Sequence, residues 1–312
     1  MDEIRITDAL TGAVIAVAPD GNTARVSEGE DRHLSPSVFF PGCSLLNYAP
    51  ALVSVLADFL AQAGVADGTS LLCCGKILDF EEDGAVRRAA ADEALRTAVA
   101  AAGVERIVAA CPNCAAALKR ALSGGEGAPA VEVAPLPRVL AEMGCRIDED
   151  VVARVLEAKR RAADGEMRLW VHDSCPDRDG YGFGRGVRAL LPDSLLIEEN
   201  LMPSSRCCGS AARAAGRFEA ALAQGARRGD EAASHGASAL VTACMSCAPS
   251  LALAQEALPV VHYLEFICDY PMDWRASARP MALRFLLEDE GERARCDGRA
   301  FMSLSPCAGG AL

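Results

Sequence analysis

The sequence lacks the excess of basic residues with which nucleic-acid-binding proteins neutralise phosphates. It contains 31 Lys and Arg residues against 43 Asp and Glu residues, which gives a formal net charge of −12. The isoelectric point is near 4.9. Clustered positive charge is what attracts a phosphate backbone or an anionic membrane surface. The composition therefore predicts a protein that does not bind nucleic acid and does not dock directly on an anionic membrane.

Long hydrophobic runs and targeting segments are also missing. The chain begins with the acidic stretch Met1-Asp2-Glu3, and the apolar segment of a secretory signal does not follow it. No stretch reaches the roughly 20 apolar residues that a membrane-spanning helix needs. We therefore expect a cytoplasmic protein without direct membrane insertion.

Common cofactor motifs are absent as well. The sequence contains neither the G-x-x-x-x-G-K-[ST] phosphate loop nor the G-x-G-x-x-G dinucleotide fingerprint. The compact ferredoxin run C-x2-C-x2-C-x3-C is missing too. The glycines of residues 180–186, with Arg178, Arg185 and Arg188, are a weaker candidate for an anion cradle. We interpret them as a loop and the first turn of a helix, and a grip on an acidic thiol substrate is the alternative hypothesis.

Cysteine is what the sequence has in excess, with 14 in 312 residues. Ten of them form two sets of five, and each member of the second set lies 132 to 134 residues after its counterpart. The first set is Cys43, Cys73, Cys74, Cys111 and Cys114, and the second set is Cys175, Cys207, Cys208, Cys244 and Cys247. A repeat of this regularity indicates an internal duplication.

The pattern within each set points to metal or redox chemistry. Each set contains a vicinal Cys-Cys pair followed by glycine, and each ends in Cys-x-x-Cys. A glycine-assisted turn can aim both thiols of the pair at one site, although adjacent side chains on a straight strand point to opposite faces. A secreted disulfide scaffold fits less well, because such scaffolds are short and poor in core residues, whereas 51% of this chain is apolar.

Short apolar runs that precede the cysteines predict buried strands. The expected strands are residues 38–40, 71–72, 107–110, 169–172 and 239–242, with a weaker one at 201–206 and a fourth of each half at 130–133 and 259–262. The expected helices are residues 49–63, 86–102, 115–122, 186–191 and 211–235, and each fourth strand leads into a further helix. This alternation is a βαβ pattern, so we predict an α/β protein with a small parallel sheet and flanking helices in each half.

A parallel sheet explains how cysteines that are distant in sequence can meet. Right-handed crossovers return every strand in the same direction, so all strand C-terminal ends lie along one edge. Ligand sites of such sheets lie at that edge. The expected organisation is a β-hairpin extension at 1–35, a first repeat at 36–165, a second repeat at 166–270, and a C-terminal tail at 271–312 with a helix near 281–287.

The two cysteine sets resemble the CCG, or cysteine-rich, domain present twice, and the chain is similar to the CCG-domain subunit of heterodisulfide reductases over roughly residues 36–270. The resemblance implies that each set of five holds a noncubane [4Fe-4S] cluster. It implies that the chain passes electrons from a ferredoxin-like iron–sulfur subunit, with a flavoprotein as a further partner, to a small disulfide or a related acceptor. The related iron–sulfur subunits of lactate, glycolate and glycerol-3-phosphate dehydrogenases suggest pure electron transfer as an alternative.

Two non-redox or simpler interpretations stay open at this point. Zinc in one or both sites is possible, because four-cysteine zinc sites use the same Cys-x-x-Cys spacing; the protein would then be a non-catalytic scaffold. The pair Cys111 and Cys114 also resembles a thioredoxin-type dithiol at a strand–helix junction.

The remaining cysteines and the histidines carry weaker expectations. Four cysteines have no counterpart in the repeat and are expected to be plain thiols: Cys145, Cys268, Cys296 and Cys307. His33 and His235 are expected at the surface. His172 and His262 end predicted strands of the second half, so they are either structural or proton donors during thiol release, since imidazole titrates near neutral pH.

Overall fold

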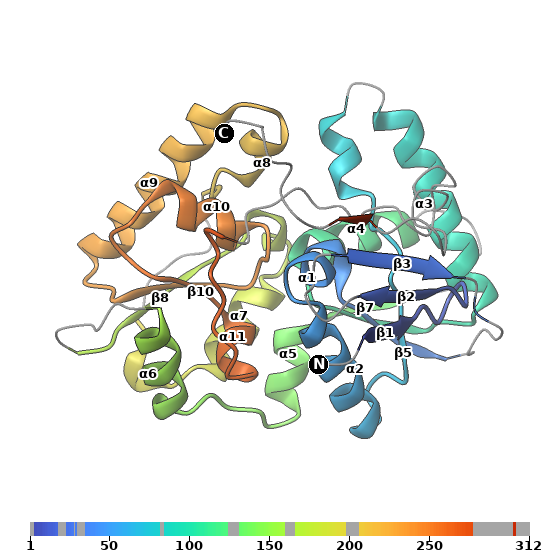
Figure 1. Cartoon of the computed structure of the whole chain (residues 1–312), viewed down its shortest axis with the longest axis horizontal. Coiled ribbons are helices and arrows are strands. Elements are labelled where there is room, and N and C mark those ends of the chain that lie inside the picture. Colours follow the sequence, from blue (N-terminus) through green and yellow to red (C-terminus); the bar gives the residue numbers. More distant parts are fainter. Residues whose placement is uncertain are drawn as a thin grey trace. The chain divides into compact units, whose positions relative to one another are not determined.

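The computed structural model describes residues 3–17, 23–27, 29, 35–81, 84–123, 131–159, 166–197, 206–276 and 302–303. The chain divides into two compact units (Figure 1). The first unit comprises Met1–Ala110, Ala117–Val133 and Arg279–Leu312, and the second comprises Cys111–Ala116 and Ala134–Ala278.

The sheet of the first repeat has the strand order β5-β4-β6-β7, and β4 pairs in parallel with both β5 and β6. Its strands are β4 (Ser37–Phe40), β5 (Gly68–Thr69), β6 (Arg106–Ala109) and β7 (Glu132–Pro135). The connecting helices are α1 (Gly42–Tyr48), α2 (Pro50–Gln62), η1 (Lys76–Phe80), α3 (Gly84–Ala101) and α4 (Pro112–Leu122). Val38, Phe39 and Phe40 are fully buried, as expected for a strand covered on both faces.

The sheet of the second repeat has the order β10-β9-β8, and both of its pairings are parallel. Its strands are β8 (Leu169–His172), β9 (Ala239–Thr242) and β10 (Val260–His262). The helices that follow β8 and β9 and close the unit are η2 (Cys175–Asp177), α7 (Gly182–Leu190), η3 (Asp193–Leu195), α8 (Ser210–Ala214), α9 (Phe218–Ser234), α10 (Cys247–Ala254) and α11 (Tyr263–Ile267). The strands β8, β9 and β10 repeat the order of β4, β6 and β7, so the predicted α/β class with two parallel sheets is confirmed.

Two helices that follow β7 belong to the second unit. They are α5 (Leu136–Glu142) and α6 (Glu149–Ala158). Helix α5 packs against α7 at such a short range that a Cβ atom added to Gly186 would lie 2.4 Å from the backbone nitrogen of Arg138. The chain is also tied here by a hydrogen bond from Ile147 N to Leu190 O of 2.8 Å. Close backbone approach of this kind requires glycine.

The N-terminal extension is a sheet of more strands than the predicted hairpin. Strands β1 (Ile4–Thr7), β2 (Val14–Val17) and β3 (Thr23–Ser27) pair antiparallel in that order, and β11 (Met302–Ser303) pairs antiparallel with β3. Figure 1 shows β1, β2 and β3 as neighbouring arrows near the start of the colour scale. The extension is joined to the first repeat by hydrogen bonds rather than by a free linker, including Ala9 N to Thr69 O at 2.8 Å.

The buried carboxylate of Asp8 is the centre of this junction. It accepts hydrogen bonds from Leu10 N at 3.0 Å, Thr11 N at 2.7 Å and the Thr11 hydroxyl at 2.8 Å. Its second oxygen accepts from the backbone N–H of Leu71, two residues before Cys73. This contact explains why the strand predicted at 71–72 is not formed: β5 ends at Thr69, and the amide of Leu71 is bound to Asp8 instead of a strand partner.

Other differences from the predicted elements have local causes. The helix predicted at 211–235 is broken into α8 and α9, with Gly216 in the left-handed region at φ 71° between them. The helix predicted at 49–63 is α2, whereas α1 before it was not predicted. The weak strand expected at 201–206, apart from Arg206, and the helix expected at 281–287 lie outside the described residues.

A buried glutamate closes the second unit. Glu265 of α11 is 0% exposed and accepts hydrogen bonds of 2.7 Å each from His262 N, Met272 N and Trp274 Nε1. The ammonium group of Lys159 lies 2.7 Å from the same carboxylate. The bond to His262 N is one half of a capping box at the start of α11.

The described helices include none that is by itself long and apolar enough to cross a membrane. Helices α1 and α2 meet that length and composition only when taken together, and they are bent by 120° at their junction.

We predict that Asp8→Ala destabilises the protein by about 2–4 kcal/mol, because each buried N–H left without an acceptor costs about 1–3 kcal/mol. Urea unfolding of the purified protein measures the change. Asp148→Ala is the matched control, because Asp148 is exposed and makes no capping hydrogen bond to α6; its effect should stay within about 0.5 kcal/mol. Equal effects of the two substitutions would contradict the role given to Asp8.

Replacing Glu265 should be more severe. Glu265→Ala removes the partner of a buried ammonium and the acceptor of three N–H groups, so we expect a loss of about 3–5 kcal/mol in the free energy of unfolding. The control is Glu256→Ala, which removes a pair with Arg275 at 3.0 Å in which Glu256 is 77% exposed. Exposed pairs contribute at most about 1 kcal/mol. A loss below that size for Glu265→Ala would show that the network is dispensable.

Candidate metal centre

The five cysteines of the second set lie where strands end and helices begin. Cys175 starts η2 shortly after β8, and Cys207 and Cys208 precede α8. Cys244 follows β9, and Cys247 is the first residue of α10. The loops after β8 and β9 lie at the C-terminal ends of parallel strands, and the turn before α8 adds Cys207 and Cys208 to the set.

Direct contacts join the sulfur atoms of this set. The Sγ atoms of Cys208 and Cys247 are 3.1 Å apart. Cys207 is hydrogen-bonded to both Cys175 and Cys208, and Cys247 is hydrogen-bonded to Cys244. The five thiols thus form one continuous group within the second unit. Cys208, Cys244 and Cys247 are buried, whereas Cys175 and Cys207 are partly exposed, so the group opens to solvent on the side of these two.

Three members of the first set form a similar group within the first unit. Cys43 lies in the first turn of α1 directly after β4, and Cys73 is hydrogen-bonded to both Cys43 and Cys74 within the first unit. Cys111 directly precedes α4, and Cys114 is the third residue of that helix. Cys111 is hydrogen-bonded to Cys244 of the second set. Corresponding members of the two sets are therefore in contact, both within the second unit.

Glycine allows the sharp turn that each vicinal pair needs. Gly75 and Gly209 both have positive φ, at 65° and 97°. A Cβ atom on Gly209 would lie 2.3 Å from the carbonyl oxygen of Ala221 in α9, so a larger residue has no room there. The backbone N–H of Gly209 points back to the sulfur of Cys207 at 3.4 Å. The expected glycine-assisted turn is present in both repeats.

The crowding of thiols has an electrostatic consequence. Hydrogen bonds from Cys175 and Cys208, and the backbone N–H groups of Gly209 and Ala211, lower the pKa of Cys207 well below its usual range. The hydrogen bond to Cys207 and burial raise the pKa of Cys208 to about 12. Contact with Cys111 and burial likewise raise the pKa of Cys244 to about 12. Thiols that resist ionising beside one another need a cation in their midst to become thiolates together, which is the property of a metal centre.

His172 brings a nitrogen atom into the same group. Ligand atoms of His172, Cys208 and Cys247 all lie within 4.8 Å of one another, and all three residues are buried. The Nε2 atom of His172 has no hydrogen-bond partner among the described residues, which is unusual for a buried polar atom. Imidazole and thiolate together suit zinc and iron. Burial and the nearby charge of Arg228 lower the pKa of His172 to about 4, so its ring is neutral at neutral pH.

His262 is placed differently from His172. Its Nδ1 accepts a hydrogen bond from Leu264 N at 3.3 Å, and its ring lies against Tyr263 and Trp274. Burial lowers the pKa of His262 to about 3. This ring is the N-cap of α11 and is neutral at neutral pH. A role of either histidine as a proton donor stays a prediction.

The other sequence candidates lie apart from the cysteine groups or outside the described residues. Arg188, which the alternative anion-cradle hypothesis included, forms a two-pronged ion pair with buried Asp173, with N–O distances of 2.8 and 3.0 Å. His235 is exposed and its Nδ1 lies 2.8 Å from Glu231 O. Cys145 and Cys268 are half-buried thiols. Outside the described residues lie His33, Cys296 and Cys307.

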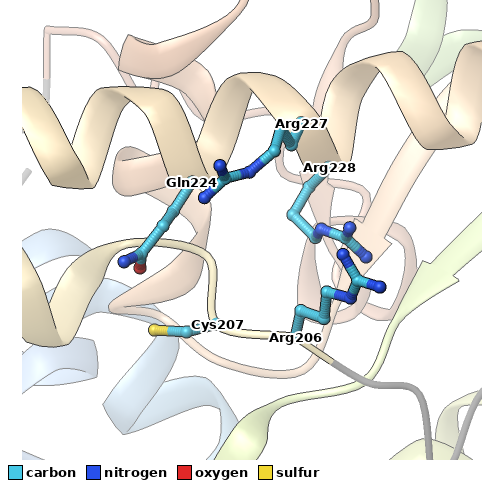
Figure 2. Close-up of a pocket in the computed structure, with 5 residues that line it drawn as sticks. All are labelled: Arg206, Cys207, Gln224, Arg227 and Arg228. Atoms are coloured by element: carbon cyan, nitrogen blue, oxygen red, sulfur yellow. The ribbon is translucent and has the colours of Figure 1, made fainter.

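The structure also shows an arginine-lined cavity that the sequence did not single out. Its lining residues are Arg206, Cys207, Gln224, Arg227 and Arg228 (Figure 2). Three of them come from α9, where basic residues on a helix look from sequence like a solvated face. Only the position of α9 beside the Cys-Cys-Gly turn reveals that these residues meet a cysteine of the second set.

We predict that Cys208→Ser lowers the metal content of anaerobically purified protein by about half, because it removes a central thiolate from one of two sites. Metal and sulfide per chain are measured by elemental and colorimetric analysis. Cys145→Ser is the matched control, since Cys145 has no counterpart in the repeat, and it should leave the content unchanged. Equal metal content in both variants would rule out Cys208 as a ligand.

Comparison with known proteins agrees with this geometry. The family model described as the cysteine-rich domain, CCG, matches the chain twice, at residues 37–119 and 169–252. No curated protein matches the chain at a significant level. The family and the clustered cysteines suggest metal or iron–sulfur binding and a redox-type function. Since the two matches cover more than half of the sequence and each includes one complete set of five cysteines, the chain belongs to the cysteine-rich (CCG) domain family and carries that domain in duplicate.

Proposed function

We propose that the protein is an iron–sulfur oxidoreductase subunit, similar to the CCG-domain subunit of heterodisulfide reductases, that reduces a small disulfide. In this proposal each set of five cysteines binds one noncubane [4Fe-4S] cluster. The observation that carries it is the continuous group of five thiols that the second set forms within the second unit. Two one-electron carriers in one chain are suited to a reaction that needs two electrons.

The donor set fits such a cofactor. Among the described residues no cysteine is in a disulfide, and the ten repeated cysteines supply the soft, largely buried thiolates that iron–sulfur clusters require. A bound cluster supplies electrons one at a time. The overall change is R–S–S–R′ + 2 e⁻ + 2 H⁺ → R–SH + R′–SH, in which the sulfur–sulfur bond breaks and both sulfur atoms are reduced.

The chain's own cysteines would bind the clusters, shield them from water on one side and leave access for the substrate on the other. Buried Cys208, Cys244 and Cys247 exclude water from one side of the second set, whereas partly exposed Cys175 and Cys207 give access on the other. Two partly exposed cysteines in the second set, against Cys43 alone in the first, support the second set as the end that meets the disulfide and the first set as the relay. Since the sequence contains no dinucleotide fingerprint, the electrons would come from a ferredoxin-like iron–sulfur subunit supplied by a flavoprotein.

A zinc site in the second set is the alternative that a specific observation favours. The triad of His172, Cys208 and Cys247, with ligand atoms within 4.8 Å of one another, has the mixed nitrogen and sulfur donors typical of structural zinc. A protein with zinc in both sets would be a scaffold in which the thiolates only hold the fold.

We expect about eight irons per chain after purification without oxygen, from two four-iron clusters. With reduced methyl viologen as the electron donor and no flavoprotein, the protein should reduce 2-hydroxyethyl disulfide. Iron, sulfide, zinc, the electron paramagnetic resonance spectrum and viologen oxidation are the measurements. Cys175→Ser should abolish the reductase activity, and Cys268→Ser, outside the repeat, is its control.

Each other outcome points to a different function. Zinc without iron or sulfide, in protein never exposed to air, would leave only the scaffold. Full iron content without any disulfide reduction would favour a pure electron-transfer subunit, in which catalysis takes place on another chain.

A further inference from the structure

The cavity beside Cys207 has a positively charged lining, in contrast to the negative net charge of the whole chain. Among the described residues that line it, three are arginines, one is Gln224 and none is acidic, although the whole chain carries a net charge of −12. Its volume of about 290 Å³ is near the lower limit for small-molecule sites, which is roughly 300 Å³. This size fits a small molecule or one arm of it, and not a macromolecule.

The positions of the arginines follow from the geometry of α9. Gln224, Arg227 and Arg228 are spaced i, i+3 and i+4, so they project from one face of the helix. Arg206 and Cys207 approach that face from the loop before α8. Figure 2 shows Arg228 and Arg206 extending from these two elements into the same space, with Gln224 and Arg227 side by side along α9.

The charges in the cavity are only partly balanced by the protein. Arg228 is 5% exposed and forms an ion pair with Glu231 of the next turn. In the part of the chain that the structure describes, Arg206 and Arg227 have no ion-pair partner. Guanidinium groups that converge in one cavity repel one another unless an anion lies between them, and their planar N–H forks match the paired oxygen atoms of a carboxylate, phosphate or sulfonate.

We propose that this cavity binds an oxyanionic group of the disulfide substrate and so holds the sulfur–sulfur bond next to Cys207. The substrate class is a small disulfide that carries a carboxylate, phosphate or sulfonate. This inference rests on the proposed reductase function for the identity of the substrate, but the binding itself requires no electrons. Arg227 and Arg206 supply charge at the accessible side, Arg228 supplies it at the buried side, and the amide of Gln224 donates a further hydrogen bond.

Two disulfides of similar size and different charge test the proposal. The dianion 3,3′-dithiodipropionate is compared with neutral 2-hydroxyethyl disulfide, using intact protein purified without oxygen. We expect the KM for the dianion, divided by the KM for the neutral disulfide, to rise about tenfold in Arg227→Gln and in Arg206→Gln. The reason is that a hydrogen bond to a charged group contributes about 1.5 kcal/mol or more. Arg217→Gln removes an exposed arginine that does not line the cavity and should leave the ratio unchanged.

Equilibrium binding separates this inference from the proposed function. Calorimetric titration with 3,3′-dithiodipropionate and with inorganic phosphate needs no reductant. Dianion binding that weakens in Arg227→Gln, in a protein without reductase activity, would support the cavity and overturn only the proposed reaction. Reduction of both disulfides with an unchanged KM ratio in both variants would overturn the proposal that the cavity binds the substrate. The proposed reaction would still stand.

Two further results would also overturn the substrate assignment. The first is a loss of iron in Arg227→Gln and Arg206→Gln with no change in binding, which would mean that the arginines balance the charge of the metal centre. The second is arginine-dependent binding of phosphate without binding of the disulfide dianion, which would mean that the cavity holds free phosphate.

Discussion

Mutual repulsion between buried thiolates is the constraint on which the rest of the structure depends. Five sulfur atoms in one water-poor group cannot ionise together unless a cation compensates them. In the second set the raised pKa values of Cys208 and Cys244 and the lowered pKa of Cys207 are the two sides of this constraint. The fold must therefore hold the sulfur atoms close enough to share a metal and must prevent their loops from moving apart.

The parallel sheets and the Cys-Cys-Gly turns meet that requirement in both repeats, but different neighbours brace the turns. In the first repeat, buried Arg88 of α3 donates to the carbonyl oxygen of Gly75, and Asp8 of the N-terminal extension holds Leu71. In the second repeat, the hydroxyl of Ser250 in α10 donates to Cys208 O at 3.0 Å. The extension is thus a structural part of the first cysteine site.

The sequence was sufficient for those parts of the structure that depend on periodicity and spacing. Apolar runs before the cysteines predicted β4, β6, β8 and β9, and the constant offset between the sets predicted the duplication. Contacts between distant segments were not predictable in the same way. The bond from Leu71 to Asp8 joins residues 63 positions apart, and nothing in the local pattern around residue 71 distinguishes an amide bound by a carboxylate from one in a strand. The same holds for the pairing of Arg188 with Asp173, which argues against the alternative hypothesis of an anion cradle.

The difference between the two repeats bears on the proposal that the first set is the relay and the second set the place of reaction. Duplication first produces two equivalent sites, and one of them can specialise only where the surroundings of its cysteines change. Arg88 in the first repeat is turned inward, where it has Asp79 and Asp92 as ion-pair partners at 3.4 Å, so its charge is compensated within the fold. Arg206 and Arg227 in the second repeat line a cavity beside Cys207. A charge that is compensated internally stabilises a loop, whereas a charge that faces a cavity is available to an incoming anion. On this argument the two repeats keep the same thiols but differ in where their arginines point, and that difference is what would make one site a relay and the other a place of reaction.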